Sequence, residues 1–309
     1  MAIKIRDYEV RLTKTKEERR QVRQLRYRVF VLEEGATPTE EQRELGEEYD
    51  SYDRFAEYMG VFHGDRVVGC YRIIDRAAAE KMDGFYSEIE FDISKIKKAR
   101  GNIAEMSRAC VDPEYRDNSL VMRMLWLGLG DYIAKKKIAI LFGMASWFGV
   151  KPLDYAMATS HLYYNHLAPL SLRATVDFDK LPPDSNPKLT RMNILPREFV
   201  NETDAYAQMG AILKGYLRLG AKFGNGVSLS NDAFKDTYSV FVMMQTKNIS
   251  RVYQKHFAGD ENAFADLGLK PGAWKTFGKI LFSPVTGMMA LAKFFLKPED
   301  AAEVKRVDD

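Results

Sequence analysis

Charged side chains occur inside segments that otherwise have the composition of a buried core or a structured turn. A charge in such a place is costly unless it is paired with an opposite charge or used in chemistry. The residues concerned are Arg26, followed four positions later by Phe30, and then Asp50, Asp53, Arg72, Glu105 and Arg108. Two interpretations are open: a buried ion-pair network that only fixes the fold, and a catalytic site whose charged groups have perturbed acidities.

Glu105 and Arg108 lie in the run "AEMSRACV", which has the pattern of a strand. Side chains three positions apart on a regular strand point to opposite faces. A single site that uses both residues therefore requires a β-bulge between them.

Common catalytic and metal-binding motifs do not account for these charges. The sequence contains no Walker A loop, G-x-S-x-G elbow or dinucleotide-binding fingerprint. Its 4 histidines are not grouped with other metal ligands, and its 2 cysteines, Cys70 and Cys110, lie in apolar runs typical of inert buried thiols. We expect no metal site. The net charge of +3 is too small for a nucleic-acid binder, so we expect no nucleic-acid partner.

The periodicity of apolar residues predicts which elements position the charged residues. Helices are predicted over residues 16–35, 119–137 (capped by Asn118 or Ser119), 152–167 and 203–224. Strands are predicted within 56–74, on either side of a turn at 63–66, and over 84–94, 101–111, 138–146 and 237–246. The acidic, turn-prone stretch 36–53 is predicted to be irregular. This order predicts an α/β chain with a mixed central sheet and flanking helices.

Residues 1–258 are predicted to form one domain, followed by an amphipathic tail over 259–309. The tail either lies in a membrane interface or packs on the surface of the domain, and its pattern fits both. No apolar run reaches the roughly 20 residues that span a bilayer, and the start of the chain lacks a secretory pattern. We expect a cytoplasmic protein with peripheral contact at the inner membrane face.

The stretch 101–126 predicts a strand, a tight loop and a helix, an arrangement that often binds phosphate at the first helical amides. Loops of this kind are usually rich in glycine. The loop "RDNS", which contains Arg116, Asn118 and Ser119, has no glycine. The residues alone leave open which phosphate-bearing donor it holds.

The order of these motifs resembles the acyl-homoserine-lactone (autoinducer) synthases. The chain is more similar to the ornithine-lipid N-acyltransferase (lyso-ornithine lipid synthase, hemolysin-like GNAT) family, over roughly residues 20–257. The segments that carry this resemblance are "RYRVFVLEEG", "VVGCYRII", "GFYSEIEFDI", "EMSRACVDPEYR", "LWLGLGDYI", "LFGMASWFG" and "GAILKGYLRLGAKFGNGVSLSNDAFKDTYSVFV".

The resemblance implies a GNAT fold, in which two parallel strands, here 104–111 and 138–146, splay apart to admit a pantetheine arm. It implies transfer of a 3-hydroxylated acyl chain from acyl carrier protein to the α-amine of an amino acid, with ornithine as the family default. No cofactor would be bound, because 4'-phosphopantetheine arrives on the carrier. The missing loop glycines favour this donor over coenzyme A. The basic runs 95–100 and 135–137 are candidates for docking the acidic carrier.

Roles for the charged residues follow from the same resemblance. Glu105 would be the general base that deprotonates the amine. Asp53 and Arg108 are further catalytic candidates, and Arg26, Phe30, Asp50 and Arg72 would bind the acceptor or orient one another. The donor would contact Ala109, Cys110, Val111, Arg116, Asn118, Ser119, Phe142, Gly143, Ser146 and Trp147, with a strand amide near 109–111 as oxyanion donor.

Alternatives remain at three points. The residues around 142–147 fit core packing as well as an acyl cleft. Within the same class, the chain fits an N-acyl-amino-acid or autoinducer-type signal synthase. A non-catalytic acyl-carrier or membrane-binding protein of the same fold is the remaining possibility.

Overall fold

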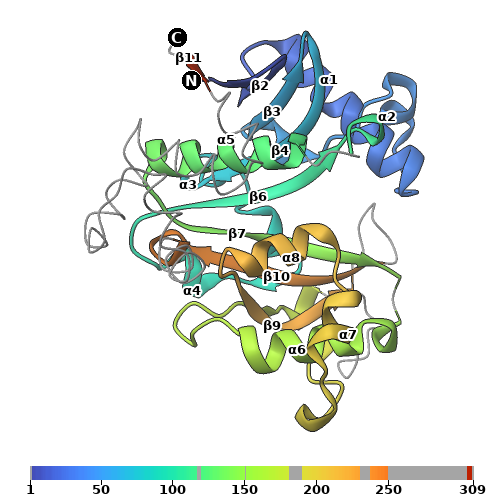
Figure 1. Cartoon of the computed structure of the whole chain (residues 1–309), viewed down its shortest axis with the longest axis vertical. Helices are drawn as coiled ribbons and strands as arrows, with labels where there is room; N and C mark the ends of the chain where they lie inside the picture. Colours follow the sequence, from blue (N-terminus) through green and yellow to red (C-terminus); the bar gives the residue numbers. More distant parts are fainter. Residues whose placement is uncertain are drawn as a thin grey trace. The chain divides into compact units, whose positions relative to one another are not determined.

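The computed structural model describes residues 2–116, 120–149, 151–180, 190–229, 237–249 and 305–307 of the 309-residue chain. The described chain divides into two compact units (Figure 1). The first contains residues 2–82 and 106–138 with the short strand at 305–307, and the second contains residues 83–105 and 139–249. One strand, β6 (Asn102–Val111), contributes residues to both units.

The first unit is built on a sheet with the strand order β11-β1-β2-β3-β4-β6. Each pair from β11 to β4 is antiparallel. The bounds of the strands are β1 Ala2–Ile5, β2 Tyr8–Leu12, β3 Glu57–His63, β4 Arg66–Asp75 and β11 Lys305–Val307. The turn between β3 and β4 is the predicted one, with Gly64 at φ 58°.

The predicted helix over 16–35 is present but changes its hydrogen-bond pattern. It begins as α1 (Lys16–Arg26) with a capping box between Thr15 and Glu18, and it continues as a π-helix over Tyr27–Glu33. It ends at Gly35, at φ 78°. The helix α5 (Leu120–Lys136) packs on β2, β3 and β4. Close approach is possible because a Cβ on its Gly128 would lie 2.6 Å from Val10 Cγ2.

The stretch predicted to be irregular, 36–53, contains two short helices. The helix α2 (Glu40–Leu45) begins at a capping box between Thr39 and Gln42 and ends at Gly46, at φ 64°. A 3-10 helix, η2 (Ser51–Arg54), follows. The prediction was wrong here because capping residues, which also favour turns, start a helix when the following residues are good helix formers.

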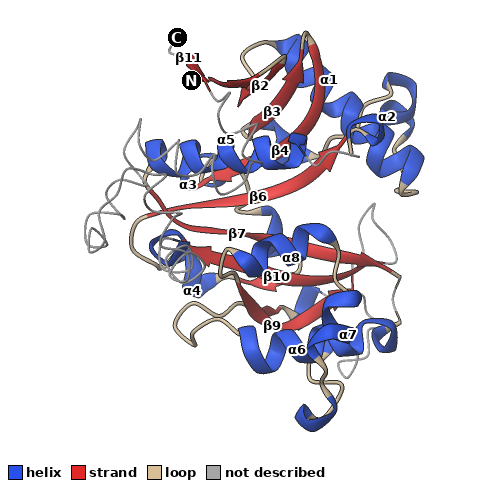
Figure 2. Cartoon of the chain, viewed as in Figure 1, coloured by secondary structure: helices blue, strands red, loops and turns tan. Residues whose placement is uncertain are grey.

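The second unit has a mixed sheet with the strand order β7-β10-β9-β8-β5. Its strands β7, β10 and β9 are labelled in Figure 2. The pairs β7–β10, β10–β9 and β8–β5 are antiparallel, whereas β8 and β9 run parallel. The bounds are β5 Phe91–Asp92, β7 Ile138–Phe148, β8 Thr175–Val176, β9 Lys222–Leu229 and β10 Thr237–Gln245.

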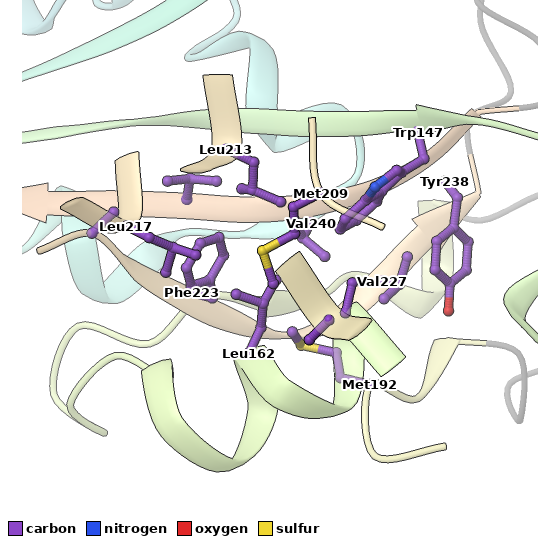
Figure 3. Packing of buried hydrophobic residues seen from close by; sticks show 14 residues of the cluster. Trp147, Leu162, Met192, Met209, Leu213, Leu217, Phe223, Val227, Tyr238 and Val240 are labelled. Atoms are coloured by element: carbon purple, nitrogen blue, oxygen red, sulfur yellow. The ribbon is translucent and has the colours of Figure 1, made fainter. Parts of the chain in front are cut away.

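Helices cover one face of this sheet and bury a common apolar core (Figure 3). The core joins α6 (Ala156–His166), α7 (Glu202–Ala207) and α8 (Ala211–Arg218) to the strands. Leu162, Leu213 and Phe223 are among its buried residues. Full burial of each such side chain contributes about 1.5–3 kcal/mol, so this core fixes the order of the strands.

Two predictions fail in the second unit. The strand predicted over 84–94 is a 3-10 helix, η3 (Tyr86–Ile89), followed by the two residues of β5. The helix predicted over 203–224 is interrupted at Gly210 and ends before Gly220, at φ 83°, after which the unpredicted strand β9 begins. In both places tertiary contacts outweigh the local pattern of apolar residues.

No helix in the described part of the chain is long and apolar enough to cross a membrane. The predicted splay concerns β6 and β7, whose residues are divided between the two units, and it stays a prediction. The boundary predicted at 258/259 and nearly all of the predicted tail lie outside the described residues.

Candidate active site

Six charged residues of the first unit form one cluster: Arg26, Glu48, Asp50, Asp53, Arg72 and Arg108. We call this set the charged cluster. It contains five of the residues singled out in the sequence, together with Glu48, which was not. Three guanidinium groups face three carboxylates, so the cluster is balanced in charge.

Arg26 and Asp53 form the most enclosed pair of the cluster. Nη1 and Nη2 of Arg26 donate to the two carboxylate oxygens of Asp53 at 2.7 and 3.0 Å, and Nε of Arg26 donates to Glu48. Arg26 is placed at the last residue of α1, where its side chain is 0% exposed. Tyr58 donates its hydroxyl to Asp53 at 2.9 Å. A two-point pair of this kind fixes orientation as well as charge.

The turn "YDSYD" holds its two aspartates through its own backbone. Asp50 accepts a hydrogen bond from the Tyr52 amide, and Asp53 accepts one from the Asp50 amide at 2.8 Å. The spacing of three residues is therefore the spacing of a capping box at the start of η2. In each aspartate one carboxylate oxygen accepts a hydrogen bond from a backbone amide of the turn. Both oxygens of each aspartate also accept a hydrogen bond from an arginine.

Asp50 lies between the two arginines that come from strands. Its Oδ1 is 2.5 Å from Nη1 of Arg72, and its Oδ2 is 2.9 Å from Nη2 of Arg108. Arg72 also donates through Nε to Ser107 Oγ at 2.9 Å, and Arg108 donates through Nε to Glu48 at 3.2 Å. The guanidinium groups of Arg72 and Arg108, which were candidates for binding the acceptor, are thus paired with carboxylates of the chain itself.

Arg108 adopts a left-handed backbone conformation with φ 53° inside β6. A non-glycine residue at positive φ breaks the regular alternation of a strand and costs conformational energy. The regular alternation of side chains along β6 is therefore interrupted at Arg108. The strain is offset by the ion pairs that the Arg108 side chain makes.

The arginines of the cluster lower the pKa values of two of its carboxylates, Asp53 and Glu48. Burial alone would raise the pKa of Asp53, but the charges of Arg26 and Arg72 and the hydrogen bond from Arg26 hold it well below its ordinary value. Burial would also raise the pKa of Glu48, but the charges of Arg26 and Arg108 hold it below its ordinary value. Groups held in this way do not accept protons near neutral pH. The structure therefore shows Asp53 as the partner of Arg26 and Arg72, and its predicted catalytic role stays a prediction.

Exposure separates one end of the cluster from the rest. The side chain of Asp50 is 24% exposed, whereas those of Arg26 and Arg72 are 0% and that of Arg108 is 9%. Phe30, in the π-helix, is also buried. Asp50 is therefore the most accessible member of the charged cluster.

Glu105 belongs to the second unit and is 0% exposed. Its Oε1 accepts a hydrogen bond from the Ser87 amide at 2.8 Å and another from the Ser87 hydroxyl. Ser87 lies in η3, the element that replaces a predicted strand. No sequence signal identified this serine, because it is a single polar residue 18 positions away in a misassigned segment.

The residues after Arg108 on β6 are enclosed. Cys110 is 4% exposed, with its sulfur 3.4 Å from that of Cys70, and burial raises the pKa of the Cys110 thiol well above its ordinary value. A neutral buried thiol is a poor nucleophile, as expected. Val111 is also buried, and Ala109 is half-buried.

Arg116 is paired within the first unit. It donates to Glu33 through Nη1 at 2.5 Å and Nη2 at 2.8 Å, and through Nε to the Val111 carbonyl at 3.0 Å. Its hydrogen bonds, opposed by partial burial, lower the pKa of Glu33. Asn118 and Ser119, predicted to complete a phosphate-binding loop and to cap the next helix, lie outside the described residues.

The four residues predicted to line an acyl cleft on β7 do not share a face. Phe142 and Ser146 point away from the helix-covered face, and the Phe142 ring lies 5.0 Å from that of Phe85. Gly143 and Trp147 are on the other face, where Trp147 belongs to the apolar core and donates Nε1 to the Gln208 carbonyl at 2.9 Å. Core packing accounts for Phe142 and Trp147, and an acyl-binding role stays a prediction.

The two basic runs differ in how their charges are used. Lys97 pairs with Glu88 at 2.7 Å, and Lys135 and Lys136 have acidic partners within 3.6 Å. Lys95, Lys98 and Arg100, at and after α4 (Ser94–Lys97), are exposed, and the charge of Lys95 acts on the nearby Asp92. In the described chain no group of three or more His, Cys, Asp or Glu side chains is arranged to hold a metal ion.

Comparisons with known proteins identify the family to which the chain is similar. The model of the acetyltransferase (GNAT) domain matches residues 25–127. The L-ornithine N(alpha)-acyltransferase of Brucella abortus (strain 2308) is 33% identical over 272 residues, which cover 84% of this chain and 92% of that protein. The protein of the same name from Rhizobium meliloti (strain 1021) is 32% identical, over 85% of this chain and 88% of that one.

A search of solved structures finds FeeM, an N-acyl amino acid synthase from uncultured soil microbes. The alignment has a TM-score of 0.43 and 13% sequence identity, and it covers 79% of this chain and 93% of that one. A TM-score below 0.5 supports no conclusion about this chain.

Proposed function

The chain belongs to the L-ornithine N(alpha)-acyltransferase family and has a GNAT domain, and from this premise we propose that it transfers an acyl chain to the α-amine of ornithine. The observation that carries the proposal is the 33% identity to a protein of that name over 84% of the chain. The product would be a lyso-aminolipid, with one amide-linked chain. The charged cluster and Glu105 supply groups that this reaction needs.

The amine attacks a thioester only in its neutral form, so the ammonium of the acceptor must first lose a proton. Glu105 is the proposed acceptor of that proton, directly or through a water molecule. Its complete burial and the hydrogen bonds from Ser87 support the assignment, because a carboxylate held in one orientation transfers protons more efficiently.

Asp50, the most accessible member of the charged cluster, and its partner Arg108 are proposed to receive the amino acid. An amino acid presents one carboxylate and one or more ammonium groups. Its carboxylate would replace that of Asp50 at the Arg108 fork, and Asp50 would then accept an ammonium. Arg26, Asp53, Arg72 and Phe30 would hold this arrangement in place.

The oxyanion of the tetrahedral intermediate is proposed to be stabilised by a backbone amide near Ala109–Val111. The positive φ of Arg108 supports this assignment, because a bulge takes neighbouring amides out of the regular ladder. The C–S bond then breaks and the thiol leaves with its carrier. No covalent intermediate on Cys110 is involved.

The acyl donor is proposed to be acyl-acyl carrier protein, with 4'-phosphopantetheine delivered by the carrier and no cofactor held by the chain. An acidic carrier would dock on Lys95, Lys98 and Arg100, whose charges are exposed. Arg116 and the glycine-free loop after it are assigned to the phosphopantetheine arm.

The chain is proposed to act in the cytoplasm, in peripheral contact with the inner membrane face through residues 259–309. An N-acylated amino acid is itself amphiphilic, so contact with a bilayer would allow its release there.

The decisive experiment incubates purified protein with 3-hydroxyacyl-carrier protein, or with the matching acyl-coenzyme A, and a panel of amino acids. Mass spectrometry is expected to show N-acyl-ornithine, formed faster from the carrier protein. Product with another amino acid only would support a different acyl-amino-acid synthase. If no product forms with any amino acid, the remaining interpretation is a non-catalytic protein of this fold.

A further inference from the structure

Ser87 is fully buried and meets the carboxylate of Glu105 with two donors. Its amide donates to Glu105 Oε1 at 2.8 Å, and its hydroxyl donates to the same oxygen. Both residues are 0% exposed. Two donors that meet on one oxygen hold the carboxylate in one orientation.

The backbone around Ser87 is fixed by a tight turn. Gly84 has φ 105°, and a Cβ at this position would lie 2.2 Å from Glu88 Oε2. That oxygen accepts a hydrogen bond from the Phe85 amide at 2.8 Å, while Glu88 Oε1 is 2.7 Å from Lys97 Nζ. The turn therefore depends on a glycine and on a partly buried ion pair.

The same turn is anchored to the sheet of the second unit. The Phe85 ring, 2% exposed, packs edge-on against Phe142 of β7. Lys180 donates to the Glu88 carbonyl at 2.5 Å. With its backbone held on both sides, Ser87 presents its two donors to Glu105 in one fixed geometry.

We propose that Ser87 is a positioning residue for acyl transfer, which holds the carboxylate of Glu105 oriented toward the proton of the attacking amine. This proposal rests on the proposed function. In the step it serves, the ammonium gives its proton to Glu105, and the neutral nitrogen bonds to the thioester carbon. The nitrogen of the adduct then loses its second proton, the C–S bond breaks, and the thiolate takes up that proton and leaves as the thiol.

Ser87→Ala removes the hydroxyl donor but keeps the backbone amide. We expect kcat for N-acyl-ornithine formation to fall about tenfold, since one hydrogen bond to a charged group is lost, while KM for both substrates stays unchanged. Ser87→Thr keeps a hydroxyl and should recover most of kcat. The matched control is Ser228→Ala on β9, whose hydroxyl is equally buried and has no partner within the described residues. Its kcat should equal that of the wild type.

A double-mutant cycle distinguishes positioning from a general loss of structure. In the Glu105→Gln background, which should already lack the base, adding Ser87→Ala should lower kcat little further. An equal loss in both backgrounds, or no recovery by Ser87→Thr, would overturn the proposal.

A second readout separates this proposal from the proposed function. Urea unfolding of the wild type, the two single variants Ser87→Ala and Glu105→Gln, and the double variant measures the coupling between Ser87 and Glu105 without any substrate. We expect the changes in the urea midpoint of unfolding to be non-additive. If the wild type acylates ornithine and Ser87→Ala keeps full kcat, only the role of Ser87 is wrong. If the wild type acylates no amino acid, the function and this role both fall, whatever the coupling shows.

Discussion

At the scale of single residues, the two interpretations left open by the sequence are not exclusive. Arg26, Asp50, Asp53, Arg72 and Arg108 do form a buried ion-pair network, as the structural interpretation predicted. The network also leaves Asp50 partly exposed beside Arg108, and this is the end where we propose that the amino acid binds. The inner pairs hold the outer pair in position.

Replacing Arg108 by lysine tests that exchange. A lysine keeps the positive charge but lacks the planar fork that meets two carboxylates. We expect KM for ornithine to rise about tenfold and KM for the acyl donor to stay the same, because one two-point contact is lost. Initial rates with each substrate varied in turn provide the measurement. A selective increase in the donor KM would place Arg108 elsewhere in the reaction.

Glu48→Gln tests the member that the sequence did not reveal. Glu48 pairs with Arg26 and Arg108, so its neutral analogue leaves an excess buried positive charge. Removing one partner of a buried ion pair costs about 3–5 kcal/mol. We expect a corresponding loss in the free energy of unfolding, measured in urea.

The control for this substitution is Glu40→Gln, whose ion pair with Arg43 on α2 is exposed. It should unfold like the wild type, since exposed pairs contribute little. Equal stability of Glu48→Gln and the wild type would show that the cluster tolerates an uncompensated guanidinium.

At the scale of elements, local sequence predicted those strands and helices whose pattern agrees with their tertiary place. The strands β3, β4, β6, β7 and β10 and the helices α1, α5 and α6 all lie where they were predicted. The segment around Ser87 was misassigned, because its alternating apolar residues arise from a turn clamped by Glu88. The strand β9 was missed for a related reason: the helical pattern before it continues past Gly220, where the backbone stops the helix.

The helix α6 makes a prediction about acid stability. Burial, followed by the charge of Lys222 and the neighbouring His161, lowers the pKa of His166 from 6.5 to about 4. The folded protein thus keeps this imidazole neutral, whereas the unfolded chain binds a proton below pH 6.5. The resulting stability is present above pH 6.5 and is lost as the pH falls toward 4.

His166→Gln removes this dependence. Between pH 6.5 and 4 the variant should lose less unfolding free energy than the wild type, by up to about 3 kcal/mol. Urea titrations at a series of pH values measure the difference. Parallel curves for the two proteins would mean that His166 titrates normally.

The segment at and after α4 makes a prediction about the donor. Changing Lys95, Lys98 and Arg100 to glutamate should raise KM for acyl-carrier protein at least about tenfold at low salt, because an acidic carrier is then repelled. KM for ornithine should not change, and neither should the rate with a small acyl-pantetheine thioester. The comparison variant carries Lys135→Glu and Lys137→Glu in the other basic run. A larger increase in KM for acyl-carrier protein in that variant would show that the carrier docks on the second run instead.

At the scale of the whole molecule, the chain divides into two compact units, with the charged cluster in the first and Glu105 with Ser87 in the second. The strand β6 supplies residues to both units. Glu105 belongs to the second unit, and Arg108, three positions later on the same strand, belongs to the first. The family and the GNAT fold predicted from the sequence are confirmed by the relatives and by the domain match.

Truncation after Gly259 tests the predicted membrane role of the tail. Vesicles that contain anionic phospholipid should bind the full chain and not the truncated one, while kcat with soluble substrates should persist. Because β11 pairs with β1, the truncated protein also requires a melting curve. A second variant, with Lys275, Lys279, Lys293 and Lys297 changed to glutamate, keeps β11 and should also lose binding. Unchanged vesicle binding by both variants would show that the tail does not contact membranes.

The sequence by itself determined the family, most of the strands and the charged residues that cannot be explained as surface. It could do so because burial cost and apolar periodicity are local properties of a chain. Only the tertiary structure decided which charges are paired, that Glu48 joins them, and that Ser87 holds Glu105. Those contacts join residues between 18 and 60 positions apart, so they depend on how the strands and turns pack, and a local pattern contains no record of that. The left-handed backbone at Arg108 belongs to the same class, because tertiary ion pairs offset its strain.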